Sequence, residues 1–466
     1  MSEDVDRRAD GQGAGSPREA GLHNASTALD EQVPPNYAWN SVAFVMDSAL
    51  FHASMSFLGT TTVLPALIAR LTPSPIAIGL ASGAATGGWL LPQLVVASAI
   101  AGKRRKKPTI VSAAWISRPL FFLVGLIVWL YAESRPQLTA ATIIAGLAVF
   151  YVLDAVVSVP WFDLLAKTIP PRRRGRVLGT SQVLGGLLGM AGGVAVSYVL
   201  GDGSPWQYPQ NHALLLMATS AVLLLSAIGL TIIREPEGKA LSGPVASFRQ
   251  VVMGLPALLQ SDRPFLRLVI TRVVGGSSGV ANAFFVLHAT DVGGLALGST
   301  GLLVSAQVLG SLAAGLLMGY VQDRTGPRAH IRIVNVLSAI PALLALAASP
   351  WAATLGRAAL YVYLLLFFSL GVIQGSQGWP FYNWVLEYAP EEQRPLYIGT
   401  LNTLAALVML APPIGGWILR TFSYPVLFAA ALGLAACALA LSAGLPSTRH
   451  VAAEAPVAVS PGEAQS

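Results

Sequence analysis

The sequence predicts an all-α integral membrane protein whose twelve transmembrane helices form two pseudo-symmetric six-helix bundles, with both termini cytoplasmic. Three observations predict this fold class: the composition, a series of long apolar runs, and an internal repeat. Of the 466 residues, 54% are hydrophobic and 11% are charged, whereas a soluble domain carries about 25% charged residues. This composition excludes a disordered chain and an ordinary soluble enzyme. The single cysteine, Cys437, excludes an internal disulfide and a cysteine metal cluster.

Twelve apolar runs lie between two polar tails, and each is long enough to cross about 30 Å of hydrocarbon. Residues 1–38 and 447–466 are predicted to be disordered cytoplasmic tails. A polar stretch, 234–263, is the predicted cytoplasmic linker between an N-terminal bundle, 39–233, and a C-terminal bundle, 264–446. The predicted spans are 40–69, 75–101, 109–132, 138–165, 177–200, 212–233, 265–289, 298–320, 331–349, 355–386, 395–419 and 423–445.

The basic residues predict the orientation of these spans. Most of the 29 Lys and Arg residues fall in the tails and in the loops that share their side of the membrane. On the other side the loops and span ends hold Arg70, Arg135, Arg357 and Arg420. Because cytoplasmic loops are enriched in Lys and Arg, both termini are predicted to be cytoplasmic. The net charge of +7 is then a topology signal, and we expect no binding of nucleic acid.

An internal repeat appears at an offset of 220 residues without gaps. Pro-Trp-Phe-Asp at 160–163 aligns with Pro-Phe-Tyr-Asn at 380–383, and Arg174 aligns with Arg394. The end of the fourth span therefore matches the end of the tenth. Two parallel copies of six helices, related by an axis normal to the membrane, are the simplest explanation.

A loop motif connects the sequence to a known family. The stretch 319–328, Gly-Tyr-Val-Gln-Asp-Arg-Thr-Gly-Pro-Arg, lies between spans eight and nine and resembles the loop signature of the major facilitator superfamily. The corresponding first-half loop, 102–107, keeps the basic residues but has no acid. Residues 88–94 and 163–176 resemble a generic bacterial branch of that superfamily. The resemblance covers about 38–445, and it implies that spans one, four, seven and ten line a central cavity.

Three charged residues of the first half lie two or more helical turns inside predicted spans, where a charge costs roughly 2.5–3.5 kcal/mol on insertion scales. They are Asp47 in span one, Arg118 in span three and Asp154 in span four. In a functional interpretation one aspartate binds and releases the coupling proton, and the sequence leaves open which of the two it is. In a structural interpretation Arg118 pairs with Asp47 or Asp154 and fixes helix packing. The repeat places Asp154 opposite another polar residue, Gln374.

Further polar residues are candidates for the substrate cavity. Gln374 and Gln377 share one face of span ten, and the alternative role for that face is hydrogen bonding between helices. Arg272 lies early in span seven. It is expected to meet an acid across the domain interface, to bind an anionic group of the substrate, or to extend toward the cytoplasmic headgroups.

Charged residues of the cytoplasmic loops are candidates for a gate that holds the two halves together on that side. The alternative is a solvated set of loop charges. The resemblance implies this role for the motif residues, and flanking charges at the turns after spans four and ten extend the set. The candidate gate residues are Asp323, Arg324, Arg328, Asp163, Arg174, Glu387 and Arg394.

These patterns together predict a secondary active transporter that moves a small organic, amphipathic solute by alternating access, coupled to protons. The alternative is a non-transporting membrane protein of the same fold that acts as an assembly factor or a sensor. The sequence holds no phosphate-binding loop and no His, Asp and Glu cluster with metal-ligand spacing. We therefore expect no enzyme activity, no cofactor and no metal. The expected partners are the solute, protons and the lipid bilayer of the cell membrane, and the chain is expected to be monomeric.

Overall fold

The computed structural model describes residues 35–100, 103–236, 248–351, 356, 358–390 and 393–448. These residues form helices and short connections and no strand. The predicted disordered tails lie outside the described residues, except that 35–36 precede the first helix, 37–38 belong to it and 447–448 follow the last.

The first six spans are formed by nine helices, because three of the spans are interrupted. Span one consists of α2 and α3, span two of α4 and α5, and span three of α6 and α7. Spans four, five and six are single helices. The bounds are α2 Tyr37–Leu58, α3 Val63–Leu71, α4 Pro75–Leu90, α5 Gln93–Ile100, α6 Lys107–Ser117, α7 Leu120–Tyr131, α8 Pro136–Thr168, α9 Pro171–Leu200 and α10 Gln210–Ile232.

The second half repeats this plan after a linker helix. The linker helix is α11, Phe248–Ser261, and its contacts with α12, α19 and α5 reach both halves. The predicted polar linker is thus partly helical. The remaining elements are α12 Arg263–Ser277, η1 Ser278–Ala281, α13 Phe285–Asp291, η2 Leu297–Ser299, α14 Thr300–Leu337, α15 Ile340–Ala348, α17 Ala358–Ser376, α18 Trp379–Tyr388, α19 Arg394–Ala405, η4 Ala406–Leu410, α20 Ala411–Thr421 and α21 Tyr424–Ala443.

Eleven helical segments of the described chain are long and apolar enough to cross a membrane. One of them, Leu297–Ala348, has 52 residues, far more than the roughly 20 that one crossing needs. It breaks at Gly326, where φ is 80° and ψ is 170°, and therefore carries spans eight and nine. The predicted twelve-span fold is confirmed. The prediction of a loop between residues 320 and 331 is wrong, because helix continues on both sides of Gly326. Glycine accepts the positive φ at this break, and Pro327 can begin the next helix directly after it.

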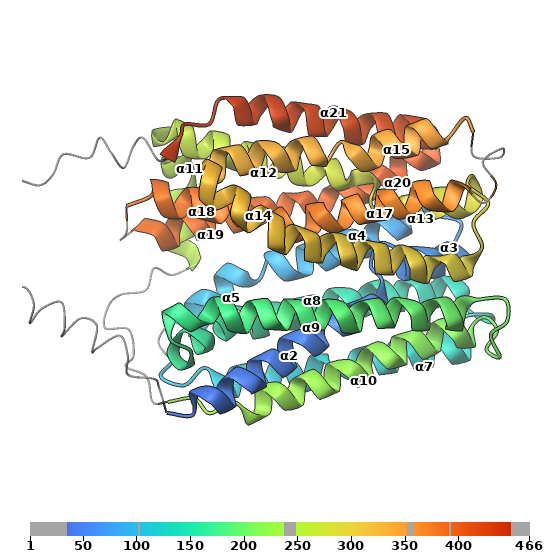
Figure 1. Ribbon diagram of the computed structural model, residues 1–466, viewed down its shortest axis with the longest axis horizontal. Helices are drawn as coiled ribbons and strands as arrows, with labels where there is room; N and C mark the ends of the chain where they lie inside the picture. The colour runs from blue at the N-terminus through green and yellow to red at the C-terminus, as the bar shows by residue number, and fades with distance from the viewer. Residues whose placement is uncertain are drawn as a thin grey trace, which may run out of the picture.

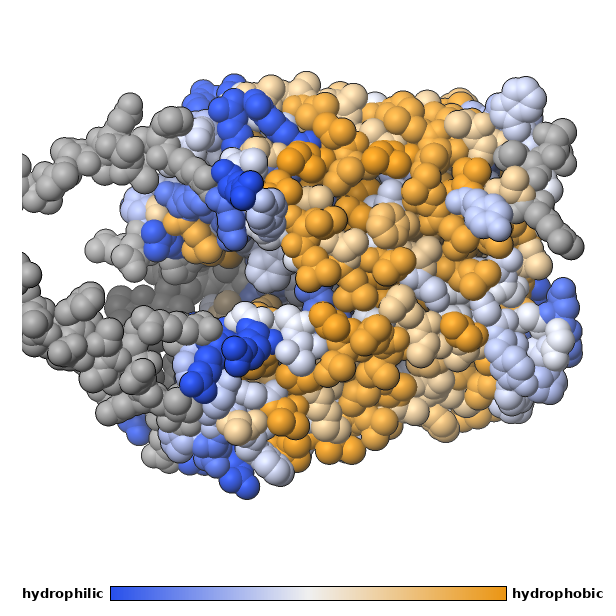
Figure 2. Space-filling view, in the orientation of Figure 1, coloured by the Kyte–Doolittle hydropathy of each residue, from blue (hydrophilic) through white to orange (hydrophobic). Residues whose placement is uncertain are grey.

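The molecule is a multi-pass membrane protein whose two halves lie side by side (Figure 1). The helices of the first half, from α2 to α10, occupy one side of the view, and those from α12 to α21 mostly occupy the other. A broad band of apolar side chains crosses the middle of the surface, and polar side chains gather at both ends (Figure 2). The helix α2 begins and α21 ends at the same end of the molecule. We call this the basic end, and the opposite one the far end.

Two helix breaks at equivalent positions shape the middle of the molecule. In span one, α2 ends at Leu58 and Gly59 takes a positive φ of 47°. In span seven, α12 gives way to the short helix η1, which contains Gly279. The two glycines are 220 residues apart, the offset of the sequence repeat. Broken helices leave polar backbone groups near the membrane midplane, where they are tolerated next to a cavity.

Glycines join the two halves closely toward the far end. A Cβ atom on Gly301 of α14 would lie 2.1 Å from the carbonyl oxygen of Gly193 on α9. A Cβ atom on Gly79 of α4 would lie 2.2 Å from the carbonyl oxygen of Pro412 on α20. Backbone therefore packs directly on backbone, and only glycine allows so close an approach.

The helices α9 and α14 separate at the basic end. A Cβ atom added to Gly175 or Gly179 near the start of α9, or to Gly319 of α14, would have no other atom within 4 Å. Figure 2 shows a recess between the two halves at this end. The interface between α9 and α14 is thus closed at the far end and open at the basic end. With the orientation that the basic residues predict, this is a conformation open to the cytoplasm.

Candidate functional site

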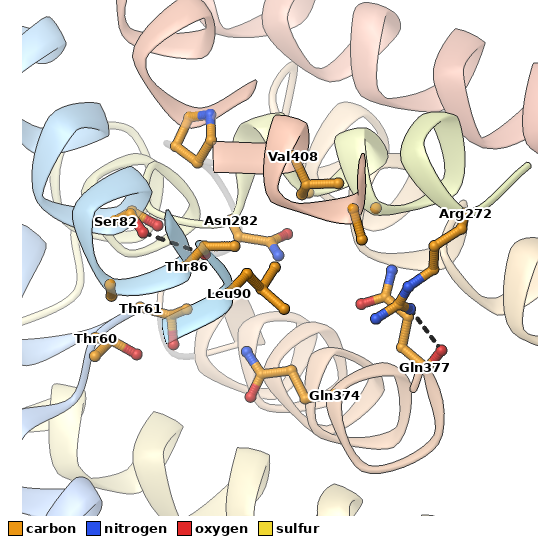
Figure 3. Close-up of a pocket in the computed structure, with 15 residues that line it drawn as sticks. Thr60, Thr61, Ser82, Thr86, Leu90, Arg272, Asn282, Gln374, Gln377 and Val408 are labelled. Carbon is orange, nitrogen blue, oxygen red and sulfur yellow. Dashed lines mark hydrogen bonds between the residues drawn. The ribbon is translucent and has the colours of Figure 1, made fainter. Parts of the chain in front are cut away.

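A cavity of about 240 Å³ lies between the two halves at the level of the helix breaks. Eight of its fifteen lining residues are polar. Figure 3 shows these polar side chains converging on one space from both halves. The polar lining residues are Thr60, Thr61, Ser82, Thr86, Arg272, Asn282, Gln374 and Gln377, and the remaining ones are Ala85, Leu90, Gly276, Gly279, Ala405, Val408 and Pro412.

The helix breaks bring several of these groups to the cavity. Thr60 and Thr61 directly follow Gly59, in the gap between α2 and α3. On the other side Gly279 belongs to η1, and Asn282 follows that short helix. The first span of each half thus contributes its interrupted segment, in agreement with the repeat.

A chain of hydrogen bonds connects the two halves across this space. The Thr61 hydroxyl donates to Oε1 of Gln307, on α14, over 2.8 Å. The Gln307 amide nitrogen donates in turn to Oε1 of Gln374, on α17, also over 2.8 Å. Gln374 therefore lines the cavity and bonds to another helix at the same time. The hydrogen bonding between helices that was considered for this polar face of span ten is thus present at Gln374.

Arg272 points from α12 toward the break between α17 and α18. Its Nη1 atom donates to the carbonyl oxygen of Gln377 over 2.7 Å (Figure 3). Its guanidinium carbon lies 5.0 Å from the centre of the Phe381 ring, a distance at which a cation is attracted to the ring face. Among the residues that the structure describes, no acid forms an ion pair with Arg272. The described residues therefore do not provide the expected acid partner across the interface.

Comparisons with known proteins agree with this architecture. Residues 267–461 match the family model described as Major Facilitator Superfamily. A nucleoside transporter of solved structure aligns with a TM-score of 0.66 at 13% identity, over 87% of this chain and 99% of its own. The chain has the major facilitator superfamily fold. Among curated proteins, none matches the sequence.

Two further solved structures share the major facilitator fold with this chain. A D-xylose-proton symporter aligns with a TM-score of 0.64 at 14% identity, over 89% of this chain and 99% of its own. The fucose:proton symporter of E. coli aligns with a TM-score of 0.55 at 12% identity, over 88% and 100%. At such low identities the likeness is one of fold.

The first half of this major facilitator fold buries two aspartates with different partners. Asp47 is 5% exposed, and its carboxylate accepts hydrogen bonds from Nε1 of Trp161 over 2.9 Å and from the hydroxyl of Ser226 over 2.6 Å. Both donors are neutral. Asp154 instead forms an ion pair with Arg118, with 3.0 Å between Oδ1 and Nη1. The structure thus pairs Arg118 with Asp154 rather than with Asp47.

The aromatic surroundings of Arg118 complete its burial. The side chain is 2% exposed, and its guanidinium carbon lies 5.0 Å from the ring centre of Phe51 and 5.6 Å from that of Phe150. Neither this arginine nor the two buried aspartates is among the residues that line the central cavity. The predicted candidates therefore separate into a cavity group (Gln374, Gln377 and Arg272) and a buried group inside the first half (Asp47, Arg118 and Asp154).

Two of the predicted gate residues occupy equivalent places in the repeat. Nε of Arg174 donates to the carbonyl oxygen of Ile169 over 3.0 Å, and Nη2 donates to that of Ala166 over 2.7 Å. Nε of Arg394 donates to the carbonyl oxygen of Ala389 over 3.3 Å. Each arginine thus satisfies a carbonyl group at the end of the preceding helix, five residues back.

Four of the other gate candidates make contacts within their own half. Asp163 forms an ion pair with Lys106 over 3.1 Å. The remaining contacts are those of Glu387 with the Thr448 hydroxyl, of Arg328 with the Ala443 carbonyl oxygen and of Arg324 with the Tyr320 ring, while Asp323 is exposed on α14. This arrangement fits halves that are apart at the basic end.

Sequence reasoning missed several polar groups of the site. Thr60, Thr61 and Asn282 line the cavity, and Gln307 bridges it. The available signal was the repeat itself, because an offset of 220 places Gly59 on Gly279 and marks both interruptions. Glu235 was missed as well: its carboxylate accepts from the backbone nitrogens at the start of α6 and pairs with Lys167.

Proposed function

We propose that this protein is a secondary active transporter that moves a small organic solute across the cell membrane by alternating access, as a monomer. The observation that carries the proposal is the cavity between the two halves, placed where the first span of each half is broken. Secondary transporters bind their substrates at such discontinuous helices near the bilayer midplane. Closure at the far end and separation at the basic end supply one of the two conformations that the cycle needs.

The lining of the cavity supports an amphipathic solute. Thr60, Thr86 and Asn282 offer hydroxyl and amide groups, whereas Leu90 and Val408 offer apolar surface. Binding sites for small molecules combine a few polar groups that fix orientation with apolar contacts. With a volume of about 240 Å³, the cavity favours a solute smaller than those that fill typical pockets of about 300–1,000 Å³.

Proton coupling is part of the proposal, and we assign it to Asp47. Asp154 has the Arg118 guanidinium at 3.0 Å, which balances its charge in the apolar interior. Asp47 has neutral partners, Trp161 and Ser226, so its charge is less well balanced in the interior of the bundle. A carboxylate of this kind is suited to take up and release a proton as the halves move. The xylose and fucose structures named above are those of proton symporters.

The loop charges are proposed to close the basic end in the opposite conformation. Asp163, Arg174, Glu387 and Arg394 lie around the turns after α8 and α18, and Asp323, Arg324 and Arg328 lie near the end of span eight. As the halves approach, acids of one half come within reach of bases of the other. The present contacts within each half would then be exchanged for contacts between halves.

Reconstitution tests the transport and coupling claims together. Purified protein in liposomes loaded with a pH dye is exposed in turn to members of a library of small organic solutes. We expect a solute-dependent change of internal pH with the native chain. The Asp47→Asn variant is expected to lose this change while still exchanging labelled solute across the membrane. Asp202→Asn, which neutralises an exposed acid in the loop after α9, serves as the matched control.

Two results would contradict the proposal in different ways. Solute-driven pH changes of native size in Asp47→Asn would show that another group binds the coupling proton. Failure of every solute to move, with a correctly folded protein, would favour the non-transporting assembly factor or sensor.

A further inference from the structure

One charged side chain stands in the wall of the central cavity. Seven of the eight polar lining residues are neutral hydroxyl or amide residues, and the eighth is Arg272. No acid is present in the lining, and no acid pairs with Arg272 among the described residues. The described lining of the cavity therefore carries one positive charge, that of a single guanidinium group.

The surroundings of Arg272 hold its guanidinium in place without neutralising it. One donor, Nη1, is bound to the backbone carbonyl oxygen of Gln377, and the Phe381 ring lies at 5.0 Å. A carbonyl group and a ring face attract a cation through their dipole and quadrupole, but neither carries a compensating charge. Arginine has five N–H donors in a rigid fork, so most of them are left for a ligand or for water.

A cation at membrane depth without a counterion is costly, and in membrane proteins such residues mark pathways and ligand sites. The contrast with Arg118 is informative. That arginine is buried inside the first half and has its own carboxylate, Asp154, at 3.0 Å. Within the described residues, the arginine away from the cavity thus has an acidic partner and the arginine in the cavity has none.

We propose that the solute carries an anionic group, a carboxylate or a phosphate monoester, which binds the free edge of the Arg272 guanidinium. This inference rests on the proposed transport function and names the class of its substrate. The planar guanidinium matches the two oxygens of such groups and binds them through paired hydrogen bonds. The amides of Asn282 and Gln374, which reach the same space (Figure 3), are placed to bind polar groups on the rest of the solute.

Arg267 provides a matched control on the same helix. It lies five residues before Arg272 on α12 and likewise donates to a backbone carbonyl group, that of Gly444, over 2.6 Å. It is not among the residues that line the cavity. Arg267→Gln and Arg272→Gln therefore remove the same charge and the same kind of hydrogen bond, but only the second changes the cavity.

The experiment compares acids with neutral analogues of the same shape. The probes are small carboxylates paired with their amides, and phosphate monoesters paired with their parent alcohols. Binding to the detergent-purified chain is measured by thermal stabilisation and titrated to give a dissociation constant. We expect at least one acid to bind and its neutral partner to bind much more weakly. Arg272→Gln should weaken the acid by about 10- to 150-fold, the value of one charged hydrogen bond.

Two further variants make the result specific. Arg267→Gln is expected to bind the acid as tightly as the native chain. Arg272→Lys keeps the charge without the planar fork and is expected to fall between the native chain and Arg272→Gln. The melting temperature without ligand is recorded for each variant, so that a loss of binding is separated from a loss of folding.

Two results would overturn the proposal that the solute is anionic. Neutral analogues that bind as tightly as their acids, with no effect of Arg272→Gln, would overturn the anionic class and leave the transport function standing. A panel in which no acid binds the native chain would also overturn it. Transport itself is judged separately by the solute-dependent pH change in liposomes, which requires no anionic solute.

Discussion

Gly301→Ala is expected to open the far end of the molecule. Gly301 lies near the start of α14 and faces α9. An added Cβ atom would lie 2.1 Å from the carbonyl oxygen of Gly193 and 2.3 Å from the backbone nitrogen of Ser197. Both atoms belong to the backbone, so no side-chain rotation relieves the overlap. Ordinary contact begins near 3.4 Å, and the two helices must therefore separate locally by roughly 1.3 Å, the difference between contact and overlap.

The overlap penalises only the conformation in which the far end is closed. Adding a methyl group to a well-packed contact costs about 1–3 kcal/mol. Since about 1.4 kcal/mol changes an equilibrium tenfold, the ratio of far-end-open to far-end-closed molecules should rise roughly 5- to 150-fold. Gly193→Ala is a milder variant of the same contact, because its Cβ would lie 2.2 Å from the Ser305 hydroxyl, which can rotate away, and 2.7 Å from the carbonyl oxygen of Gly301, a smaller backbone overlap. Its effect should be smaller.

Distance measurements between spin labels test this directly. The single cysteine, Cys437, is exposed and is replaced by serine, and labels are attached at Asp202 and Ala296, just beyond the far ends of α9 and α14. Gly301→Ala should shift the distance distribution toward longer values. Gly433→Ala, on α21 with no atom within 4 Å of the added Cβ, should leave it unchanged. A native distribution in a folded Gly301→Ala protein would refute the idea that glycine packing keeps the far end closed.

The other stability predictions concern ion pairs and helix ends. Asp154→Asn should lower the unfolding free energy by about 3–5 kcal/mol, because it leaves the Arg118 charge buried and unpaired, whereas the double variant with Arg118→Met should regain most of the loss. Thermal unfolding in detergent measures both, and a double variant no more stable than Asp154→Asn would contradict the assignment. Arg174→Ala should destabilise more than Arg394→Ala, since Arg174 makes two hydrogen bonds of 3.0 and 2.7 Å and Arg394 makes one of 3.3 Å; equal melting temperatures would count against this comparison.

The fold could be predicted from the sequence because hydropathy leaves little freedom in a membrane. Apolar runs of sufficient length must be helical there, since every backbone group needs a partner. The connection between spans eight and nine was predicted less well. A polar stretch normally indicates a loop, but here Gly326 turns the chain within one residue, and the helix continues on both sides. Hydropathy does not distinguish a loop from a polar helix end that projects into water.

The site was predicted in part, and the reason lies in the chemistry of its residues. Arg272, Gln374 and Gln377 were found because charges and amides are conspicuous in an apolar span. Threonines are not, because a buried threonine commonly bonds to its own helix, as Thr271 does with the Arg267 carbonyl oxygen over 2.8 Å. The Thr61 hydroxyl bonds to Gln307 on another helix instead, because its own helix is broken before it. The sequence did not decide whether Arg118 pairs with Asp47 or with Asp154. The depth of a residue can be counted along the chain, but which sides of two helices face each other cannot.

The two halves of the repeat share the helix breaks but differ in their charged residues, and this difference bears on how coupling could work. Gly59 matches Gly279 at the helix breaks. By contrast, the offset of 220 places Asp47 on Arg267 and Asp154 on Gln374. On the proposed assignment, the proton site therefore belongs to the first half and the anion-binding residue, Arg272, to the second. The two residues lie in different halves, so a movement of one half against the other can couple the two binding events. A change at the glycine interface should then affect both binding events, whereas Asp47→Asn should affect coupling alone.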